Sequence, residues 1–303
     1  MMVQKKWLLW FVAAALLFNG CAAEPRVIPI PAPPETAVRA VDWLDENYPQ
    51  LLVAIVSVMV REMNFPLING IVTIYPNYQT FEAGLAIQFE ANMRRSEERT
   101  GKRQPDAVRQ ENIESAARQR AATATAVAIG NNVVVNAIAF RRYKWSERVR
   151  VLAHELTHVL QYDLSDHRPA GWEHWMIEGF ADWTAYKVLD QLGIENFSKS
   201  RQDIIDTIIA GHARNALPSL SQLYSTADII TWTRTLGRYA AYGQGMIATD
   251  LLIKEKGLQS VLDYFRKFAK INNRQRNFNE AFRETLAQFD ARFTQHLAVM
   301  GRE

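Results

Sequence analysis

The sequence predicts an α+β fold, in which a small mixed sheet with helices is followed by a mainly helical C-terminal part. Two segments with strand-like composition, Ile71–Tyr75 and Ala126–Phe140, lie in the first half of the chain. From Trp145 onward the apolar residues recur at helical spacing, interrupted mainly at glycine, proline or asparagine. A third indication is a histidine-containing helix at the junction of the two parts, which is described below.

The composition excludes several classes of protein. The chain has 303 residues, of which 48% are hydrophobic and 22% are charged, so it is not a fully disordered protein. The single cysteine, Cys21, excludes an intrachain disulfide framework and cysteine-rich zinc fingers. The formal charge of +3 is too small to indicate nucleic-acid binding on its own.

The N-terminus has the features of an export signal. Two lysines precede an apolar run, Trp7–Phe18, which is too short to span a bilayer as a helix. The position of Cys21 resembles that of the lipidated cysteine in a bacterial lipobox, although Phe18 and Asn19 differ from the residues preferred there. We therefore expect residues 1–20 to be a signal peptide and Cys21 to attach the protein to a membrane of the bacterial cell envelope. Cleavage after Ala23, which would discard Cys21, is the alternative.

The rest of the chain is expected to form one domain. Residues 21–35 are rich in proline and predict an extended tether, so the folded part is expected to begin near Thr36. Within residues 36–303 we expect an α/β part at 36–165 and a helical part at 166–303. The first strand is expected to lie between two helices, Val38–Glu62 and Tyr78–Arg95.

The densely charged segment Arg94–Arg120 allows two interpretations. Its mixed signs favour a solvated pair of helices. The alternative is a basic patch for anionic partners such as lipid headgroups or cell-wall polymer.

The segment His154-Glu155-Leu156-Thr157-His158 carries the clearest chemistry. On a helix, His154 and His158 project from the same face, so that two imidazoles can bind one metal ion. Glu155 is placed to act as general base on a metal-bound water. With only six histidines in the chain, this spacing is rare by chance.

A catalytic zinc ion needs a third protein ligand and an open fourth position. Glu178 follows His158 at a distance that suits one helix, a turn and a returning helix. Asp182 lies one helical turn beyond Glu178 and is expected to bind the second ring nitrogen of a ligand histidine. The small residues Gly179 and Ala181 are expected to let the two helices approach closely.

This combination, HELTH…WMIEGFADW, resembles the gluzincin metallopeptidases, the superfamily of thermolysin and the zinc aminopeptidases. The resemblance implies a zincin-like fold, a zinc ion held by His154, His158 and Glu178, and Glu155 as general base. It also implies that Ala126–Phe140 is the edge strand beside the cleft, able to pair with an extended peptide. A plain buried strand is the alternative.

The resemblance also implies a hydrogen-bond donor for the transition state on a downstream helix. Tyr239 is the first candidate and Tyr242 the second, and His212 is a further one; packing of the tyrosines in the core is the alternative. His167, His174 and His296 are expected to be surface or interface histidines.

These observations predict zinc-dependent hydrolysis of peptide bonds by an exported metallopeptidase, tethered to the membrane through Cys21, with a peptide or protein as substrate. A non-catalytic envelope lipoprotein with a structural or vestigial zinc site, acting as an interaction module, is the alternative. Nucleic-acid binding through Arg94–Arg120 is opposed by the export signal and by the nearly neutral charge that remains after its removal.

Overall fold

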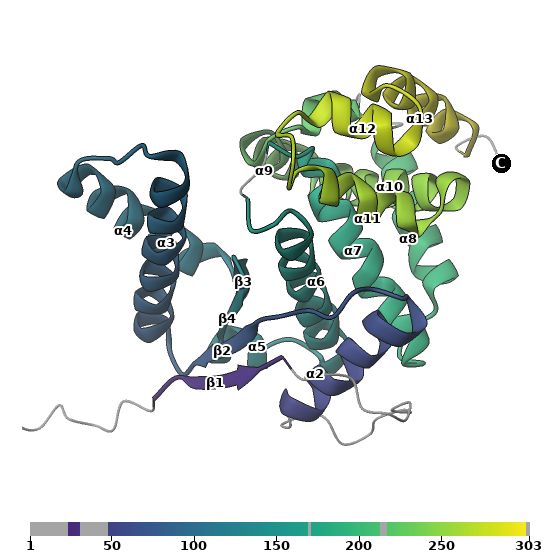
Figure 1. Ribbon diagram of the computed structural model, residues 1–303. Coiled ribbons are helices and arrows are strands. Elements are labelled where there is room, and N and C mark those ends of the chain that lie inside the picture. Colours follow the sequence, from purple (N-terminus) through teal and green to yellow (C-terminus); the bar gives the residue numbers. More distant parts are fainter. Residues whose placement is uncertain (1–23, 31–47, 169–170, 213–216, 301–303) are drawn as a thin grey trace, which may run out of the picture.

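The computed structural model describes residues 24–30, 48–168, 171–212 and 217–300 (Figure 1). The expected signal peptide, Cys21 and most of the expected tether lie outside these residues. Within them the fold is α+β, as predicted, and helices predominate over a small sheet.

The sheet is mixed. Its strands are β1 (Arg26–Pro29), β2 (Ile71–Tyr75), β3 (Ala126–Ile129) and β4 (Asn132–Asn136), in the spatial order β1-β2-β4-β3. β2 is antiparallel to β1 and parallel to β4, and β3 is antiparallel to β4. β2 coincides with the predicted strand.

The first strand corrects the expected start of the folded part. Residues 26–29 fall in the segment predicted to be a tether, but they pair with β2 in the register Arg26↔Ile74 to Pro29↔Ile71. Ile28 is buried by this pairing, while Val27 remains exposed. The folded part therefore begins before Thr36. An edge strand as short as this one is stabilised by its long-range partner, which local composition does not reveal.

The second predicted strand, Ala126–Phe140, is a hairpin followed by a short helix. Gly130 has a φ of +62°, and with Asn131 it forms a two-residue turn that pairs Ile129 with Asn132. β4 therefore lies inside the sheet, and β3 forms its edge. The chain then enters α5 (Ala137–Arg141), where the Asn136 side chain accepts hydrogen bonds from two backbone N–H groups.

Helices cover the sheet on both sides. The elements of the N-terminal part are α2 (Tyr48–Ser57), the π-helical turn η1 (Val58–Glu62), α3 (Tyr78–Thr100) and α4 (Asp106–Thr123). α3 begins where Asn77 Oδ1 accepts from Thr80 N, and the left-handed Gly101 follows its last residue as the C-cap. α3 and α4 form a helical pair, joined by an ion pair of 3.3 Å between Arg109 and Glu97, that stands apart from the C-terminal helices (Figure 1). The charged segment Arg94–Arg120 lies on this pair and is largely exposed.

From Trp145 the described chain is helical, as predicted. Its elements are α6 (Trp145–Leu164), α7 (His174–Gln191), α8 (Phe197–His212), the 3₁₀ turn η2 (Leu220–Leu223), α9 (Thr226–Leu236), the π-helical turn η3 (Tyr239–Gly243), α10 (Gln244–Lys256), α11 (Leu258–Lys267), α12 (Arg274–Phe282) and α13 (Leu286–Met300). Among the described residues, no helix combines the length and the apolar character needed to cross a membrane.

α7 is the central helix of this part and is largely buried. It packs against α6 on one side and α10 on another. Gly179, expected to face α6, instead lies against α10, where a Cβ atom would be 2.2 Å from the carbonyl carbon of Gly245. The backbones of α7 and α10 can therefore touch only because both positions are glycine.

Candidate metal centre

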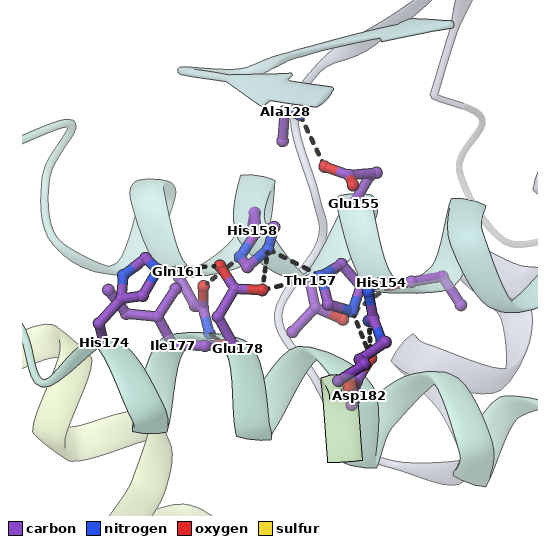
Figure 2. A network of polar contacts seen from close by, with 12 residues as sticks. Ala128, His154, Glu155, Thr157, His158, Gln161, His174, Ile177, Glu178 and Asp182 are labelled. Atoms are coloured by element: carbon purple, nitrogen blue, oxygen red, sulfur yellow. Dashed lines mark hydrogen bonds and ion pairs between the residues drawn. The ribbon is translucent and has the colours of Figure 1, made fainter. Parts of the chain in front are cut away.

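α6 and α7 bring the predicted ligands together. His154 and His158 project from one face of α6, while Leu152, Leu156 and Val159 are fully buried. Glu178 lies on α7, which returns alongside α6 as predicted (Figure 2). Each of the three side chains offers one atom to a common position that could hold a metal ion.

The spacing of these atoms fits a tetrahedral ion. His154 Nε2 lies 3.1 Å from His158 Nε2 and 3.3 Å from Glu178 Oε2, and the third edge of the triangle is 3.7 Å. Bonds of about 2.0–2.1 Å at tetrahedral angles place ligand atoms about 3.3 Å apart. The three donors therefore stand where three ligands of one ion would stand.

Two acceptors orient the histidines. His154 Nδ1 donates to Asp182 Oδ1 at 2.8 Å, as predicted for Asp182. His158 Nδ1 lies 2.8 Å from Gln161 Oε1, and Gln161 Nε2 donates to the carbonyl of Ile177. With both Nδ1 atoms bonded in this way, the neutral imidazoles turn two Nε2 lone pairs toward the Glu178 carboxylate. A cation bound between these three ligand atoms would remove the repulsion between their lone pairs.

Without a metal ion, a proton has to take that place. Burial alone would lower the pKa of His154, but the charges of Asp182 and Glu178 outweigh burial and raise it to about 10. Burial would likewise raise the pKa of Glu178, but His158 and His154 hold it well below its usual range. These charges favour a protonated histidine paired with carboxylates when no metal ion is bound.

Metal binding is expected to release this proton. His154 keeps it up to its pKa of about 10, and the proton must leave before Nε2 can bind a cation. The apparent affinity should rise with pH, about tenfold per unit for one displaced proton, and level off near that pKa. Calorimetric titration in two buffers of different ionisation enthalpy measures the release. Identical heats in the two buffers would contradict the expectation.

Asp182 is expected to strengthen metal binding. Asp182→Ala removes the acceptor that orients His154, so metal affinity should fall about 10- to 100-fold. Asp182→Asn keeps an acceptor oxygen and should lose less. Competition with a chromophoric chelator measures both, and Asp203→Ala, an exposed aspartate on α8, is the control. Wild-type affinity in Asp182→Ala would remove this role.

Glu155 lies beside the ligands but does not join them. Its Oε2 accepts a hydrogen bond of 2.7 Å from the backbone N–H of Ala128 on β3 (Figure 2). Among the described residues its other oxygen, Oε1, has no hydrogen-bond partner. Glu155 thus connects the metal-binding helix to the edge of the sheet.

The centre opens into a cleft of about 470 Å³ between the two parts of the fold. β3 and the end of α4 line one side, and α6, α7, α9 and η3 line the other. Ala126–Ile129, as β3, is therefore both a sheet edge and a wall of the cleft.

The structure separates the two tyrosine candidates. Tyr242 lines the cleft, and its phenol has a raised pKa because it is buried and faces Glu178. Tyr239 is 43% exposed and is not part of the cleft wall. His212 ends α8, and its side chain is outside the described part of the structure.

Two site residues were missed by the sequence analysis. His174, expected at the surface or an interface, lines the cleft, and its Nε2 lies 3.4 Å from Glu178 Oε1. Gln161 holds His158. Both have helical spacing to a predicted ligand, His174 four residues before Glu178 and Gln161 three after His158. His167 is exposed, as expected, and His296 is partly buried on α13.

Comparison with known proteins gives one match. Residues 88–165 match a family model described as the eCIS core domain. The matched segment runs from α3 to the end of α6, so it includes His154, Glu155 and His158 but not Glu178. It spans less than a third of the chain. No curated protein and no solved structure matched. The similarity is consistent with a metallopeptidase-like fold over the matched segment.

Proposed function

We propose that this protein is a zincin-like metallopeptidase of the gluzincin type, which hydrolyses peptide bonds with zinc. The observation that carries the proposal is the triangle formed by His154 Nε2, His158 Nε2 and Glu178 Oε2, with edges of 3.1 to 3.7 Å. The cleft above it and the match to the eCIS core domain support it.

The donor set favours zinc. Magnesium and calcium prefer oxygen ligands, whereas two imidazoles with one carboxylate form a three-ligand set that leaves a position open on zinc. When bound there, zinc would act as a Lewis acid on a substrate carbonyl and lower the pKa of a water molecule toward 7. A zinc ion needs ligands that are deprotonated and correctly oriented. The hydrogen bonds to Asp182 and Gln161 orient the two imidazoles, and the low pKa of Glu178 keeps its carboxylate ionised.

The remaining chemistry falls to residues of the cleft. Glu155 would accept a proton at Oε1 and deliver it to the leaving nitrogen, while Oε2 stays anchored to Ala128. Tyr242, kept protonated by its raised pKa, would donate a hydrogen bond to the developing oxyanion. Ala126 and Ala128 turn their backbone groups away from β4. The Ala128 N–H is bonded to Glu155, so an extended peptide could pair with the Ala126 N–H and with the carbonyls of Ala126 and Ala128.

The place of action is part of the same proposal. We infer an exported protein of the bacterial cell envelope, attached through a lipid on Cys21. The support is the sequence pattern of residues 1–21. Mass spectrometry of the mature N-terminus distinguishes a lipidated Cys21 from cleavage after Ala23.

Metal analysis combined with peptide profiling tests the function. The purified protein should hold one zinc ion per chain, cleave members of an unbiased peptide mixture, lose the activity with a chelator and regain it with zinc. Zinc binding without any cleavage would overturn the proposal.

One observation favours a second function. The contact between Glu155 and Ala128 gives this carboxylate a structural role, as a non-catalytic envelope module with a structural zinc site would require. In that case the chain would bind zinc, cleave nothing, and lose stability when Glu155 is replaced by alanine.

A further inference from the structure

Three arginines line the cleft around the metal-binding group, and no function above uses them. Arg150 lies on α6 one helical turn before His154, Arg120 near the end of α4, and Arg238 just before η3. Arg238 is engaged, since its guanidinium lies 3.4 Å from Asp182 and 4.3 Å from the centre of the Tyr242 ring. Arg120 and Arg150 are not engaged in this way.

Arg120 and Arg150 have no carboxylate partner among the described residues. The acidic side chains of the cleft are committed, since Glu178 belongs to the metal-binding group and Glu155 is bonded to Ala128. Arg150 packs over the face of Tyr186, at 5.8 Å from the ring centre, and its charge also acts on Asp182 without forming an ion pair with it. Two guanidinium groups therefore face the cleft with their hydrogen-bond donors available to a ligand.

These two cations lie on different walls of the cleft that holds the metal-binding group. Arg150 lies on α6, with its guanidinium over the Tyr186 ring. Arg120 lies on the other wall, near the end of α4. An extended peptide bound in the cleft would lie between the two walls that carry them.

We propose that the cleft selects peptides that carry a carboxylate next to the scissile bond, and that Arg150 is its main specificity determinant. This inference rests on the proposed peptidase function. A guanidinium group binds a carboxylate through two parallel hydrogen bonds, and this pairing is strengthened in a partly desolvated cleft. Arg150 is placed for it because it lies on the same helix as His154. The carboxylate is either a glutamate or aspartate side chain or the C-terminus of the peptide.

The test compares matched peptides that differ in one charge. Two peptides have an amidated C-terminus and carry either glutamate or glutamine next to the cleaved bond. A third peptide carries glutamine at that position and has a free C-terminus. We expect kcat/KM to be at least about tenfold higher with a carboxylate than without one. Preference for the amidated glutamate peptide identifies the side chain as the source, and preference for the free C-terminus identifies the terminal carboxylate.

Substitution of Arg150 provides the second arm. In Arg150→Gln, the ratio of kcat/KM for the carboxylate peptide to kcat/KM for the neutral peptide should fall close to one. Arg150→Glu should favour a peptide with lysine at the same position. Arg99→Glu, an exposed arginine at the end of α3 outside the cleft, makes the same charge change and should leave the ratio unchanged. Equal cleavage of charged and neutral peptides by the wild type, or an unchanged ratio in Arg150→Gln, overturns the inference and leaves the peptidase function intact.

Measurements of peptide binding test the carboxylate selectivity separately from the peptidase function, even if no peptide is cleaved. In zinc-loaded Glu155→Gln protein, the dissociation constants of the same peptides are measured directly. Tighter binding of the carboxylate peptides supports the inference even if the proposed function fails. Equal binding overturns it.

Discussion

Glu155→Gln is expected to abolish peptide hydrolysis while zinc remains bound. Glutamine cannot accept the proton, so kcat should fall by at least about 10²- to 10⁴-fold, the usual contribution of a general base. Metal content should not change, because Glu155 is not one of the three donors. Steady-state kinetics on a cleaved peptide, with zinc measured in the same sample, give both values.

The glutamine variant keeps the contact with the sheet edge. Its amide oxygen can still accept the hydrogen bond from Ala128, whereas Glu155→Ala removes it. Urea unfolding of the two variants therefore separates loss of the base from loss of the contact. Hydrolysis at the wild-type rate in zinc-loaded Glu155→Gln would rule out Glu155 as the base.

Gly179→Ala is expected to cause the largest loss of stability among the substitutions considered. The added Cβ would lie 2.2 Å from both the carbonyl carbon and the oxygen of Gly245, so backbone rather than a flexible side chain has to move. Separating α7 from α10 should cost about 1–3 kcal/mol or more. Metal affinity should fall too, because Glu178 is the preceding residue of α7. Urea unfolding measures the first effect and chelator competition the second.

Gly211→Ala is the matched control. Gly211 is also helical, on α8, but nothing lies within 4 Å of its added Cβ. This variant should be as stable as the wild type, or more stable by up to about 1 kcal/mol, because alanine favours the helix. If Gly179→Ala unfolded at the same urea concentration as Gly211→Ala, the close approach of α7 and α10 would not be important for stability.

Elements specified by local periodicity could be predicted from the sequence. β2 and the helical second half follow from alternation and from helical spacing. The sequence predicts one strand where the structure has the hairpin of β3 and β4, because both of its strands are apolar and only Gly130 and Asn131 interrupt them. β1 was missed because its stability comes from pairing with β2, distant in the sequence.

The metal-binding group could likewise be predicted, because His154 and His158 are related by one helical turn. The contacts made by His174 and Glu155 depend on how α7 and β3 pack against α6, which spacing alone does not give. The order of the tyrosine candidates depends on η3. Its π-helical turn is wider than an α-helical one, which increases the angle between the two side chains, and packing places Tyr242 rather than Tyr239 at the cleft.

α7 has a consequence for the protein as a whole. This mostly apolar helix carries two carboxylates, Glu178 and Asp182, into the interior, where their side chains are 14% and 7% exposed. Buried anions need compensating positive charge. In the proposed metal-bound state the ion would take over from the protonated His154 as counter-ion of these carboxylates, and the folded state would gain stability with the free metal concentration. The melting temperature would then report metal occupancy.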